Sequence, residues 1–554
     1  MLTINRARMR LNACALLAGA AFCLPSPAAP QPAAAPATAP AGVGAVASAF
    51  DLDADVARAM ASFDVPGMAI AIVKDGVVLA AKGFGVRQLG RPAPVDGQTL
   101  FEVASNSKAF TAAALAMLVD EGKLNWDDPV TKHLPDFQMY DPYVTGAMTV
   151  RDLLTHRSGL GLGAGDLLWW PTSTFSADEI IEKLRYIRPA TSFRSGYAYD
   201  NLLYIVAGKI VAQQAGMPWG AAIRARILHP LGMDASTTSL AENVGKSNLA
   251  SPHSKIDERT VVVKPMPVAN AAGAVGSNTS AEDIARWMTV LLDGGAIAGA
   301  APGADGRPAR LFSETQSREM WRAHTPIKIV EPKPALAATR PDFSAYGLGF
   351  NLRDYQGRKL VLHGGALQGF YSRVVMVPEA KLGIAILTNA ENNAAISALQ
   401  WRLLDHYLNL APSDWIGAYA GVERDAHRAA LSRVAKAAAA RAATSPPSLP
   451  LAAYEGRYQD PWYGDVRIAR EGRRQVLRFG RSPDLNGTLE HFQHDTFIVR
   501  WKERNFNADA YVTFALNPDG SIEHMKMAPL SEETDFSFDF ADLSFTPVKP
   551  VSAK

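Results

Sequence analysis

Two spacings of apolar residues divide the chain into a mixed helix-and-strand part and a later strand-only part. The stretch MAIAIVKDGVVLAAKGFG places two apolar runs on either side of Asp75-Gly76, a pair that favours a tight hairpin turn. Two further strand-like runs come late, RVVMVP from Arg373 and GIAILTN from Gly383. Because these strands enclose a long helical middle, we expect one antiparallel sheet with a large helical insertion.

The helical middle carries start signals as well as periodicity. Thr149 with Asp152, and Ser280 with Asp283, each place an acidic residue three positions after a hydroxyl residue, as in a capping box. The second pair precedes IARWMTVLLDGG, whose terminal glycines are typical of a helix end. These signals predict helices that begin directly after Thr149 and Ser280.

The pattern changes twice beyond about Leu410. RDAHRAALSRVAKAAAARAAT is an alanine-rich, basic helical stretch, and SPPSLP ends it. We interpret it as a connecting helix with a solvated basic face; an acidic partner is the alternative. From about Leu451 the runs VRIAR, VLRF, TFIVRW, YVTFAL and SIEHMKM alternate in polarity, which predicts an antiparallel β domain of about 100 residues.

The predicted fold class is α/β (α+β), an antiparallel sheet flanked by helices with a large helical insertion, plus a C-terminal barrel-like β domain. The expected boundaries are a signal segment at 1–28, an Ala/Pro-rich tether at 29–49, the mixed domain at 50–410, the helical linker at 411–450 and the β domain at 451–554.

The N-terminus has the composition of an export signal. Three arginines within the first ten residues precede an apolar run from Leu11 to Leu24, and small residues follow. The run is shorter than the roughly 20 residues that a membrane span requires. We expect cleavage near Ala28 and a periplasmic or secreted protein; a buried N-terminal helix is the alternative. Both cysteines, Cys14 and Cys23, lie in this segment, so the exported protein would contain none.

Charge and composition narrow the classes of function. Lysine and arginine total 56 and aspartate and glutamate 54, which leaves a net charge of +2. A chain so balanced offers no case for binding nucleic acid or a polybasic attachment to membranes. No segment after the signal is long and apolar enough to span a membrane, so a soluble protein is expected; its oligomeric state stays open.

The strongest chemical signal lies in FEVASNSKAFTAAALAMLVDEGKL, where Ser105 opens an apolar helical pattern and Lys108 follows three positions later. Residues three apart share one face of a helix, so the hydroxyl and the amine can meet. The helix dipole favours an alkoxide, and burial lowers the pKa of a lysine until it can accept a proton. The pair can therefore activate a serine nucleophile without histidine. Because on the order of two S-x-x-K matches arise by chance in a chain this long, the pair needs support.

Two later motifs supply that support. SGYAYDN contains a Y-x-N at Tyr199 to Asn201, and LVLHGGALQGFY contains an H-x-G at His363 to Gly365. In this order, S-x-x-K, Y-x-N and H-x-G resemble the serine β-lactamase-like superfamily of class C β-lactamases, DD-peptidases, D-aminopeptidases and related esterases. The phrases LLTHRSGL, AAGAVGSNTSAEDIARW and HGGALQGFYSRVVMVPEAKLGIAILTN are similar to that family too, and the resemblance covers roughly residues 50–410. It implies a β-lactamase/transpeptidase-like fold.

The resemblance implies a role for each motif residue. Ser105 would be the acylated nucleophile and Lys108 its hydrogen-bonded activator. Tyr199 would act as phenolate or proton relay, with its ordinary pKa of about 10 lowered by the neighbouring Lys108 cation. Asn201 would hold Lys108 and position the substrate carbonyl.

The H-x-G strand would provide the edge against which the substrate lies. The backbone N–H groups of Ser105 and Ala366 are expected to form the oxyanion hole. Gly364 and Gly365 fit there because substrate backbone must approach the strand closely. His363 stands where β-lactamases of this type carry lysine, and a mostly neutral imidazole holds a carboxylate less firmly. The resemblance therefore favours a peptidase, amidase or esterase over a β-lactamase.

Single motif residues also have ordinary structural interpretations. Tyr199 and Asn201 taken alone would be a core tyrosine and a cap or turn residue, and only the joint order of the motifs favours catalysis. Asp200 replaces a small residue of the family, so it either faces away from the substrate or binds a substrate ammonium. His156, in LLTHRSGL, is interpreted as structural because it closes a helix.

The predicted function is an exported serine hydrolase that cleaves amide bonds of small peptides, including ones with D- or unusual residues, through a Ser105 acyl-enzyme. Ester or lactam cleavage by the same groups is one alternative, and a β-lactam or cell-wall-peptide binding protein with little turnover is another. The sequence has no G-x-S-x-G, no H-E-x-x-H and no paired Cys/His set, so no metal or cofactor is expected.

The C-terminal β domain has two interpretations. It either supports or covers the hydrolase domain, or it binds a ligand of its own through Trp462, Tyr463 and Trp501. The second interpretation requires those aromatic rings to lie on the surface of the domain.

Overall fold

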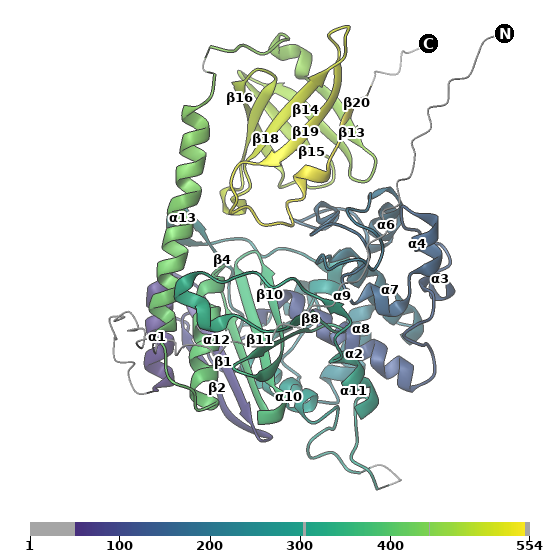
Figure 1. The fold of residues 1–554 in the computed structure, drawn as a ribbon, viewed down its shortest axis with the longest axis vertical. Helices are drawn as coiled ribbons and strands as arrows, with labels where there is room; N and C mark the ends of the chain where they lie inside the picture. The colour runs from purple at the N-terminus through teal and green to yellow at the C-terminus, as the bar shows by residue number, and fades with distance from the viewer. Residues whose placement is uncertain (1–49, 303–305, 443, 549–554) are drawn as a thin grey trace, which may run out of the picture. The chain divides into compact units, whose positions relative to one another are not determined.

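The computed structural model describes residues 50–302, 306–442 and 444–548. The predicted signal segment and tether lie outside the described residues. The described chain contains two eight-stranded antiparallel sheets, and helices pack on both faces of the first one (Figure 1). This arrangement confirms the predicted fold class.

The first sheet combines strands from the two ends of the hydrolase domain in the order β2-β1-β12-β11-β10-β9-β8-β7. Asp75 and Gly76 both have positive φ angles, 51° and 78°, so the turn between β1 and β2 is the hairpin that this dipeptide predicts. The strands are β1 (Gly67–Lys74), β2 (Val77–Gly85), β7 (Thr325–Pro326), β8 (Ser344–Tyr346), β9 (Asn351–Tyr355), β10 (Arg358–Leu367), β11 (Phe370–Val377) and β12 (Leu382–Thr388).

The helical insertion lies between β2 and β7, as predicted. Thr149 caps α5 with a full capping box, and Ser280 caps α10 by accepting the N–H of Asp283. The helices of the insertion are α2 (Ser107–Asp120), α3 (Val130–His133), α4 (Pro142–Ala147), α5 (Val150–Leu153), α6 (Ala177–Lys183), α7 (Leu202–Ala215), α8 (Trp219–Ile223), α9 (Ala272–Val275), α10 (Ala281–Leu292) and α11 (Glu314–Met320). Two short hairpin pairs accompany them, β3 (Phe101–Glu102) with β6 (Asn278–Thr279) and β4 (His253–Ile256) with β5 (Arg259–Val262).

Two hydrophobic cores cover the two faces of the first sheet. One core joins the sheet to the helical insertion, and the other joins it to α1 (Leu52–Phe63), α12 (Asn393–Tyr407) and the start of α13 (Trp415–Ala439). All of β12 is buried, which explains why its sequence is a continuous apolar run. Successive residues of β10 point into opposite cores, so Val361 faces the insertion and Leu362 faces α12.

The alanine-rich stretch forms α13, a helix of 25 residues with few buried positions after Ala420. Its basic groups are not all solvated, because Arg433 and His427 contact Glu532 and Glu533 of the C-terminal β domain at 2.6 and 3.1 Å. Acidic partners for this face therefore lie within the same chain.

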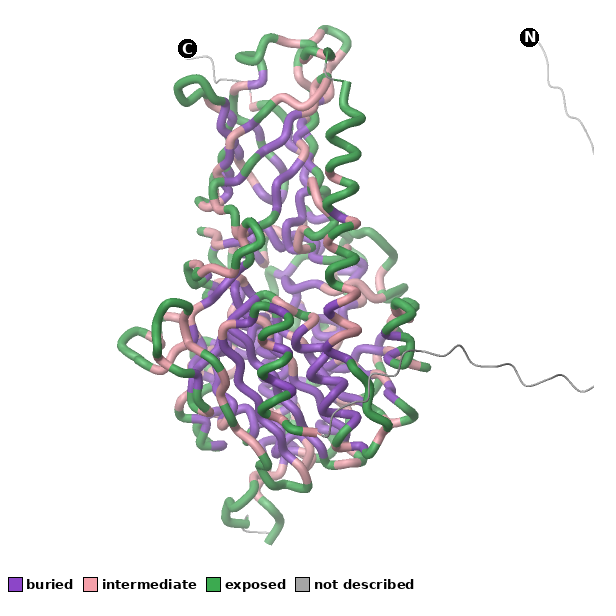
Figure 2. Tube along the Cα trace, turned by 90° about the vertical axis from the view of Figure 1, so that its left-hand side faces the viewer, coloured by how far each residue is buried: buried purple, intermediate pink, exposed green. Residues whose placement is uncertain are grey.

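The C-terminal β domain is an eight-stranded antiparallel sheet whose two edges meet at a bridge between Met525 and Phe545. Buried positions run along its strands as they do in the first sheet (Figure 2). Its strands are β13 (Gly456–Asp460), β14 (Gly464–Glu471), β15 (Arg474–Phe479), β16 (Asn486–Gln493), β17 (Thr496–Trp501), β18 (Ala510–Leu516), β19 (Ile522–Pro529) and β20 (Thr546–Pro547).

The ligand-binding interpretation of this domain is wrong in its proposed form. Trp462, Tyr463 and Trp501 are only 4%, 0% and 1% exposed, because they fill the interior of the barrel-like sheet. The Trp501 indole donates to the Ala508 carbonyl at 2.7 Å, so even its polar atom is satisfied internally. None of the described helices combines the length and apolarity needed to cross a bilayer.

Candidate active site

Ser105 lies on a short 3₁₀ turn, Ala104–Asn106, directly before α2. The preceding Ala104 has a φ of 47°, in the left-handed region that alanine rarely adopts. Strained backbone of this kind is concentrated at functional sites. The turn presents the Ser105 side chain to the pocket, and α2 carries Lys108 one turn further on.

The Lys108 amine is at the centre of the site and is completely buried. Its Nζ donates to Ser105 Oγ at 3.0 Å, to Asn201 Oδ1 at 2.7 Å and to the Ala274 carbonyl at 3.3 Å. Burial lowers the pKa of Lys108 to about 7, against the opposing charges of two buried aspartates. A substantial share of the amine is therefore neutral near pH 7 and can accept a proton.

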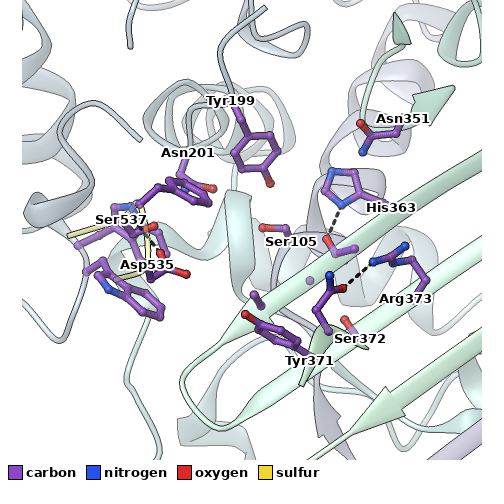
Figure 3. A pocket seen from close by; sticks show the side chains of 17 residues that line it. Ser105, Tyr199, Asn201, Asn351, His363, Tyr371, Ser372, Arg373, Asp535 and Ser537 are labelled. Carbon is purple, nitrogen blue, oxygen red and sulfur yellow. Dashed lines mark hydrogen bonds between the residues drawn. The ribbon is translucent and has the colours of Figure 1, made fainter. Parts of the chain in front are cut away.

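Tyr199 packs against this pair, with its ring centroid 4.8 Å from Lys108 Nζ. Its hydroxyl points towards Ser105, to which it is hydrogen-bonded (Figure 3). Burial raises the pKa of Tyr199 well above its ordinary value. The expectation of a lowered tyrosine pKa is therefore wrong, because desolvation outweighs the attraction of a lysine that is itself largely neutral. Tyr199 is a protonated phenol in this site.

The two residues after Tyr199 face different surroundings. Asn201 links two groups, since its Oδ1 accepts from Lys108 and its Nδ2 donates to Asp166 at 2.8 Å. Asp200 is completely buried and accepts the N–H of Leu203 at 3.1 Å. Asp200 is absent from the pocket lining, so the suggestion that it binds a substrate ammonium is wrong.

The histidine of the H-x-G motif is neutral. His363 is buried, and its Nε2 lies 2.8 Å from the Tyr346 hydroxyl. Burial lowers the pKa of His363 to about 3, with a further contribution from Lys108. It therefore supplies no positive charge to a substrate at neutral pH. His156 is buried among Tyr199, Tyr346 and other rings, in agreement with its structural interpretation.

The two glycines of the motif are present for different reasons than substrate approach alone. A Cβ atom at Gly365 would lie 2.1 Å from the carbonyl oxygen of Val103, so only glycine allows β10 to pack against the turn that carries Ser105. A Cβ atom at Gly364 would meet only the Arg373 side chain, at 3.3 Å.

A substitution at Gly365 is expected to destabilise the protein more than one at Gly364. Gly365→Ala forces β10 away from the Val103 carbonyl, which should lower the free energy of unfolding by about 1–3 kcal/mol. Gly364→Ala asks only a side chain to move, so its loss should be smaller. Urea denaturation of both variants checks this order, and equal stabilities would contradict it.

A pocket of about 320 Å³ opens beside Ser105 (Figure 3). The helical insertion, the strands β10 and β11 and the C-terminal β domain all contribute to its walls. The lining residues are Ser105, Trp169, Trp170, Tyr199, Asn201, Asn351, His363, Gly364, Gly365, Ala366, Tyr371, Ser372, Arg373, Asn393, Asp535, Phe536 and Ser537. The predicted motif residues Ser105, Tyr199, Asn201, His363, Gly365 and Ala366 thus share one cavity.

Polar groups stand at two opposite ends of the pocket (Figure 3). Asp535 lies at one end, beside Ser537, and Arg373 lies at the other. The Arg373 guanidinium donates to Asn393 and to Gln400, and its Nε has no partner among the described residues. Sequence reasoning missed these residues because each is a single polar residue far along the chain from the motifs.

The described residues contain no group of three His, Cys, Asp or Glu side chains that could hold a metal ion. The chemistry of the site therefore has to be argued from the serine, the amine and the phenol.

Comparison with known families defines the class of the protein. The family model described as Beta-lactamase matches residues 52–409, and the chain belongs to that family. With the Ser105–Lys108 contact, it is a serine hydrolase of β-lactamase fold. A second family model, a domain of unknown function (DUF3471), matches residues 440–547, which include all strands of the C-terminal β domain. The resemblance stated from the motifs is confirmed.

Particular relatives narrow the comparison. The chain is 31% identical to Unguisins hydrolase ungD' of Aspergillus campestris, over 85% of this chain and 88% of that protein. It is 27% identical to Unguisins hydrolase ungD of Aspergillus violaceofuscus, over 85% and 86% of the two chains. Protein flp of Staphylococcus aureus is 26% identical over 61% of this chain and 62% of its own length.

Solved structures share the fold. The octameric penicillin-binding protein homologue from Pyrococcus abyssi aligns with a TM-score of 0.54 and 22% identity, covering 89% of this chain and 98% of its own. D-amino acid amidase from Ochrobactrum anthropi SV3 aligns with a TM-score of 0.52 and 23% identity, covering 65% and 97%. At these identities the likeness concerns the fold alone.

Proposed function

We propose that the protein is an exported hydrolase that cleaves amide bonds of small peptides through an acyl-enzyme on Ser105. The observation that carries the proposal is the 3.0 Å contact between Ser105 Oγ and a buried lysine amine whose pKa is lowered to about 7. A neutral amine at that distance is a proton acceptor for a serine nucleophile. The names of two similar proteins, an unguisins hydrolase and a D-amino acid amidase, agree with amide cleavage.

In the acylation step, Ser105 Oγ attacks the carbonyl carbon of the scissile amide, and its proton passes to Lys108 Nζ. The backbone N–H groups of Ser105 and Ala366 are expected to bind the oxygen of the tetrahedral intermediate. Collapse of the intermediate breaks the C–N bond. The leaving nitrogen takes a proton from the Tyr199 hydroxyl, which regains one from Lys108, so the amine product leaves neutral.

Deacylation repeats the same steps with water. Lys108 and Tyr199 remove a proton from a water molecule, and its oxygen attacks the acyl carbon of the ester at Ser105. The proton returns to Ser105 Oγ when the C–O bond to the serine breaks. The enzyme is then ready for another substrate, and a carboxylic acid is released.

The ends of the pocket support a short peptide as substrate. A carboxyl group, Asp535, and a guanidinium, Arg373, stand at opposite ends of the cavity that contains Ser105. A short peptide also carries polar or charged groups on both sides of its scissile bond. His363 is neutral, so the cationic grip that lysine offers to the carboxylate of a β-lactam is missing at that position.

A substrate panel tests this function. The purified protein is incubated with short peptides of L- and D-residues, with p-nitrophenyl esters and with a chromogenic lactam, and the products are identified by mass spectrometry. Cleavage of one or more peptides at a rate above that of the lactam is expected. Rapid cleavage of the lactam with no peptide product would reject the proposed substrate class.

The pH dependence of kcat/KM should reflect Lys108. A lysine whose pKa is lowered to about 7 is protonated and unable to accept a proton at pH 5, and it becomes neutral as the pH rises through 7. We therefore expect kcat/KM to increase between pH 5 and 8 and then to level off. His363 should add no step in this range, because its pKa is about 3. A profile that falls between pH 6 and 8 would contradict a neutral lysine as base.

A further inference from the structure

A continuous chain of hydrogen bonds connects the C-terminal β domain to the nucleophile. Ser537 Oγ donates to Asp166 Oδ2 at 2.8 Å across 371 positions of sequence. Asn201 Nδ2 donates to the same oxygen at 2.8 Å, and Asn201 Oδ1 accepts from Lys108 Nζ at 2.7 Å. Lys108 in turn contacts Ser105 at 3.0 Å.

Asp166 is a buried carboxyl group that depends on few donors. Its side chain is completely buried and accepts hydrogen bonds from the Trp169 indole at 2.8 Å, from Asn201 and from Ser537. Burial raises the pKa of Asp166 to about 7, while these donors and Lys108 favour the ionised form. Because hydrogen bonds to an ionised group are the strong ones, the loss of one donor shifts this balance towards the neutral acid.

The same C-terminal segment holds the backbone that carries Asp166. Asp539 Oδ2 accepts the N–H of Gly165 at 2.6 Å. Burial raises the pKa of Asp539 to about 9, so this carboxyl is neutral at pH 7 and adds no like charge beside Asp166. Phe536 lies against the Tyr199 ring, with 6.2 Å between the ring centroids. Residues 536–539 therefore contact two parts of the active site at once.

Several titratable groups surround Lys108 and Asp166, and the two charges are coupled. Asp166 and Asp200 both favour the protonated amine. The groups that face the pair are Tyr199, Tyr204, Asp200, His156, His363 and Asp539. Among them Asp166 alone is bonded to the C-terminal β domain by a side-chain hydroxyl.

We propose that Asp166 and Ser537 are positioning residues for Lys108, so that the C-terminal β domain completes the active site. Asp166 orients the Asn201 amide, the amide orients the lysine, and Ser537 keeps the carboxylate ionised and in place. This goes beyond the proposed function and uses its acyl-enzyme only as a readout. It gives the domain of unknown function a role in catalysis.

The test uses Ser537→Ala in the full-length protein. We measure the rate constant for acylation of Ser105 by an activated phenyl ester between pH 5 and 9. The rate should fall roughly tenfold, since a hydrogen bond to an ionised group is lost. The rising limb should move to lower pH, because a more neutral Asp166 no longer raises the pKa of Lys108. Asp166→Asn should act in the same direction more strongly, and Ser537→Thr, which keeps the hydroxyl, should restore the profile.

Ser482→Ala is the matched control. Ser482 is also a completely buried serine of the C-terminal β domain, and it accepts a hydrogen bond from Tyr463 at 2.9 Å, but it does not line the pocket. It should lower the melting temperature without changing the acylation rate or its pH limb. A Ser537→Ala profile equal to the wild type, or the same shift in Ser482→Ala, would overturn the proposal.

A second measurement does not depend on turnover. In protein labelled with ¹³C-lysine, the Lys108 resonance, assigned by its loss in Lys108→Met, is titrated in the wild type and in Ser537→Ala. A titration that moves to lower pH in the variant supports the proposal, and an unmoved titration rejects it. If the ester fails to acylate wild-type Ser105, the proposed function fails, and the titration still decides the role of Ser537.

Discussion

Ser105→Ala should reduce turnover of any substrate by at least about 10⁴-fold, because the variant lacks the oxygen that forms the acyl-enzyme. Covalent labelling by an acylating probe should be lost at the same time. The fold should be retained, since the Ser105 hydroxyl faces the pocket and its hydrogen bonds serve the chemistry. Intact-protein mass spectrometry after probe treatment, together with steady-state kinetics, checks both expectations.

Ser107→Ala is the control for this variant. Ser107 lies two residues further on, is completely buried and accepts the N–H of Ser277 at 2.9 Å. Removing its hydroxyl leaves a buried donor unpaired, which lowers the free energy of unfolding by about 1–3 kcal/mol. The labelled peptide should still contain Ser105. Labelling that persists in Ser105→Ala would show that the nucleophile lies elsewhere.

Lys108→Met should slow acylation by roughly 10²–10⁴-fold, the range that general bases contribute. Methionine is close to lysine in length, so the side chain still fills the space in α2 while the proton acceptor is lost. The rise of kcat/KM through pH 7 should disappear together with the group that produces it. Stopped-flow acylation between pH 5 and 9 measures both effects.

Lys209→Met tests whether loss of any lysine has this effect. Lys209 lies on α7, is 40% exposed and pairs with Asp178 at 2.6 Å. Exposed pairs of this kind contribute about 0–1 kcal/mol, so rate, pH profile and stability should stay near those of the wild type. Should Lys108→Met keep a wild-type rate and the same rising limb, the amine would have no part in proton transfer.

The position of the C-terminal β domain gives the pocket a wall that the family fold alone does not provide. Asp535, Phe536 and Ser537 line the cavity, and none belongs to the residues matched by the Beta-lactamase model. Specificity and catalysis therefore share a segment that is distant in sequence from every motif. Substrates that fit a serine hydrolase without this domain need not fit this pocket.

Local features were predictable because they depend on residues close together in sequence. The turn at Asp75-Gly76 requires positive φ angles that glycine readily adopts, and the caps at Thr149 and Ser280 involve bonds across three residues. The Ser105–Lys108 contact follows for the same reason, since one turn of helix brings the two side chains together.

Burial could not be predicted in the same way. The expected low pKa of Tyr199 considered one neighbouring charge, whereas its surroundings come from several distant elements and raise that pKa instead. Trp462 and Trp501 resembled a binding surface in sequence, yet the curvature of the barrel-like sheet turns them inward.

The sequence by itself determined the helix that bears Ser105 and Lys108, the order of the three motifs and the kinds of elements in each domain. Only the tertiary structure decided which groups lose contact with water and which remote segments meet, namely Asp166 with Ser537 and Phe536 with Tyr199. The physical reason is that desolvation and long-range contacts depend on how the whole chain packs. Spacing along the chain sets only interactions within a few residues.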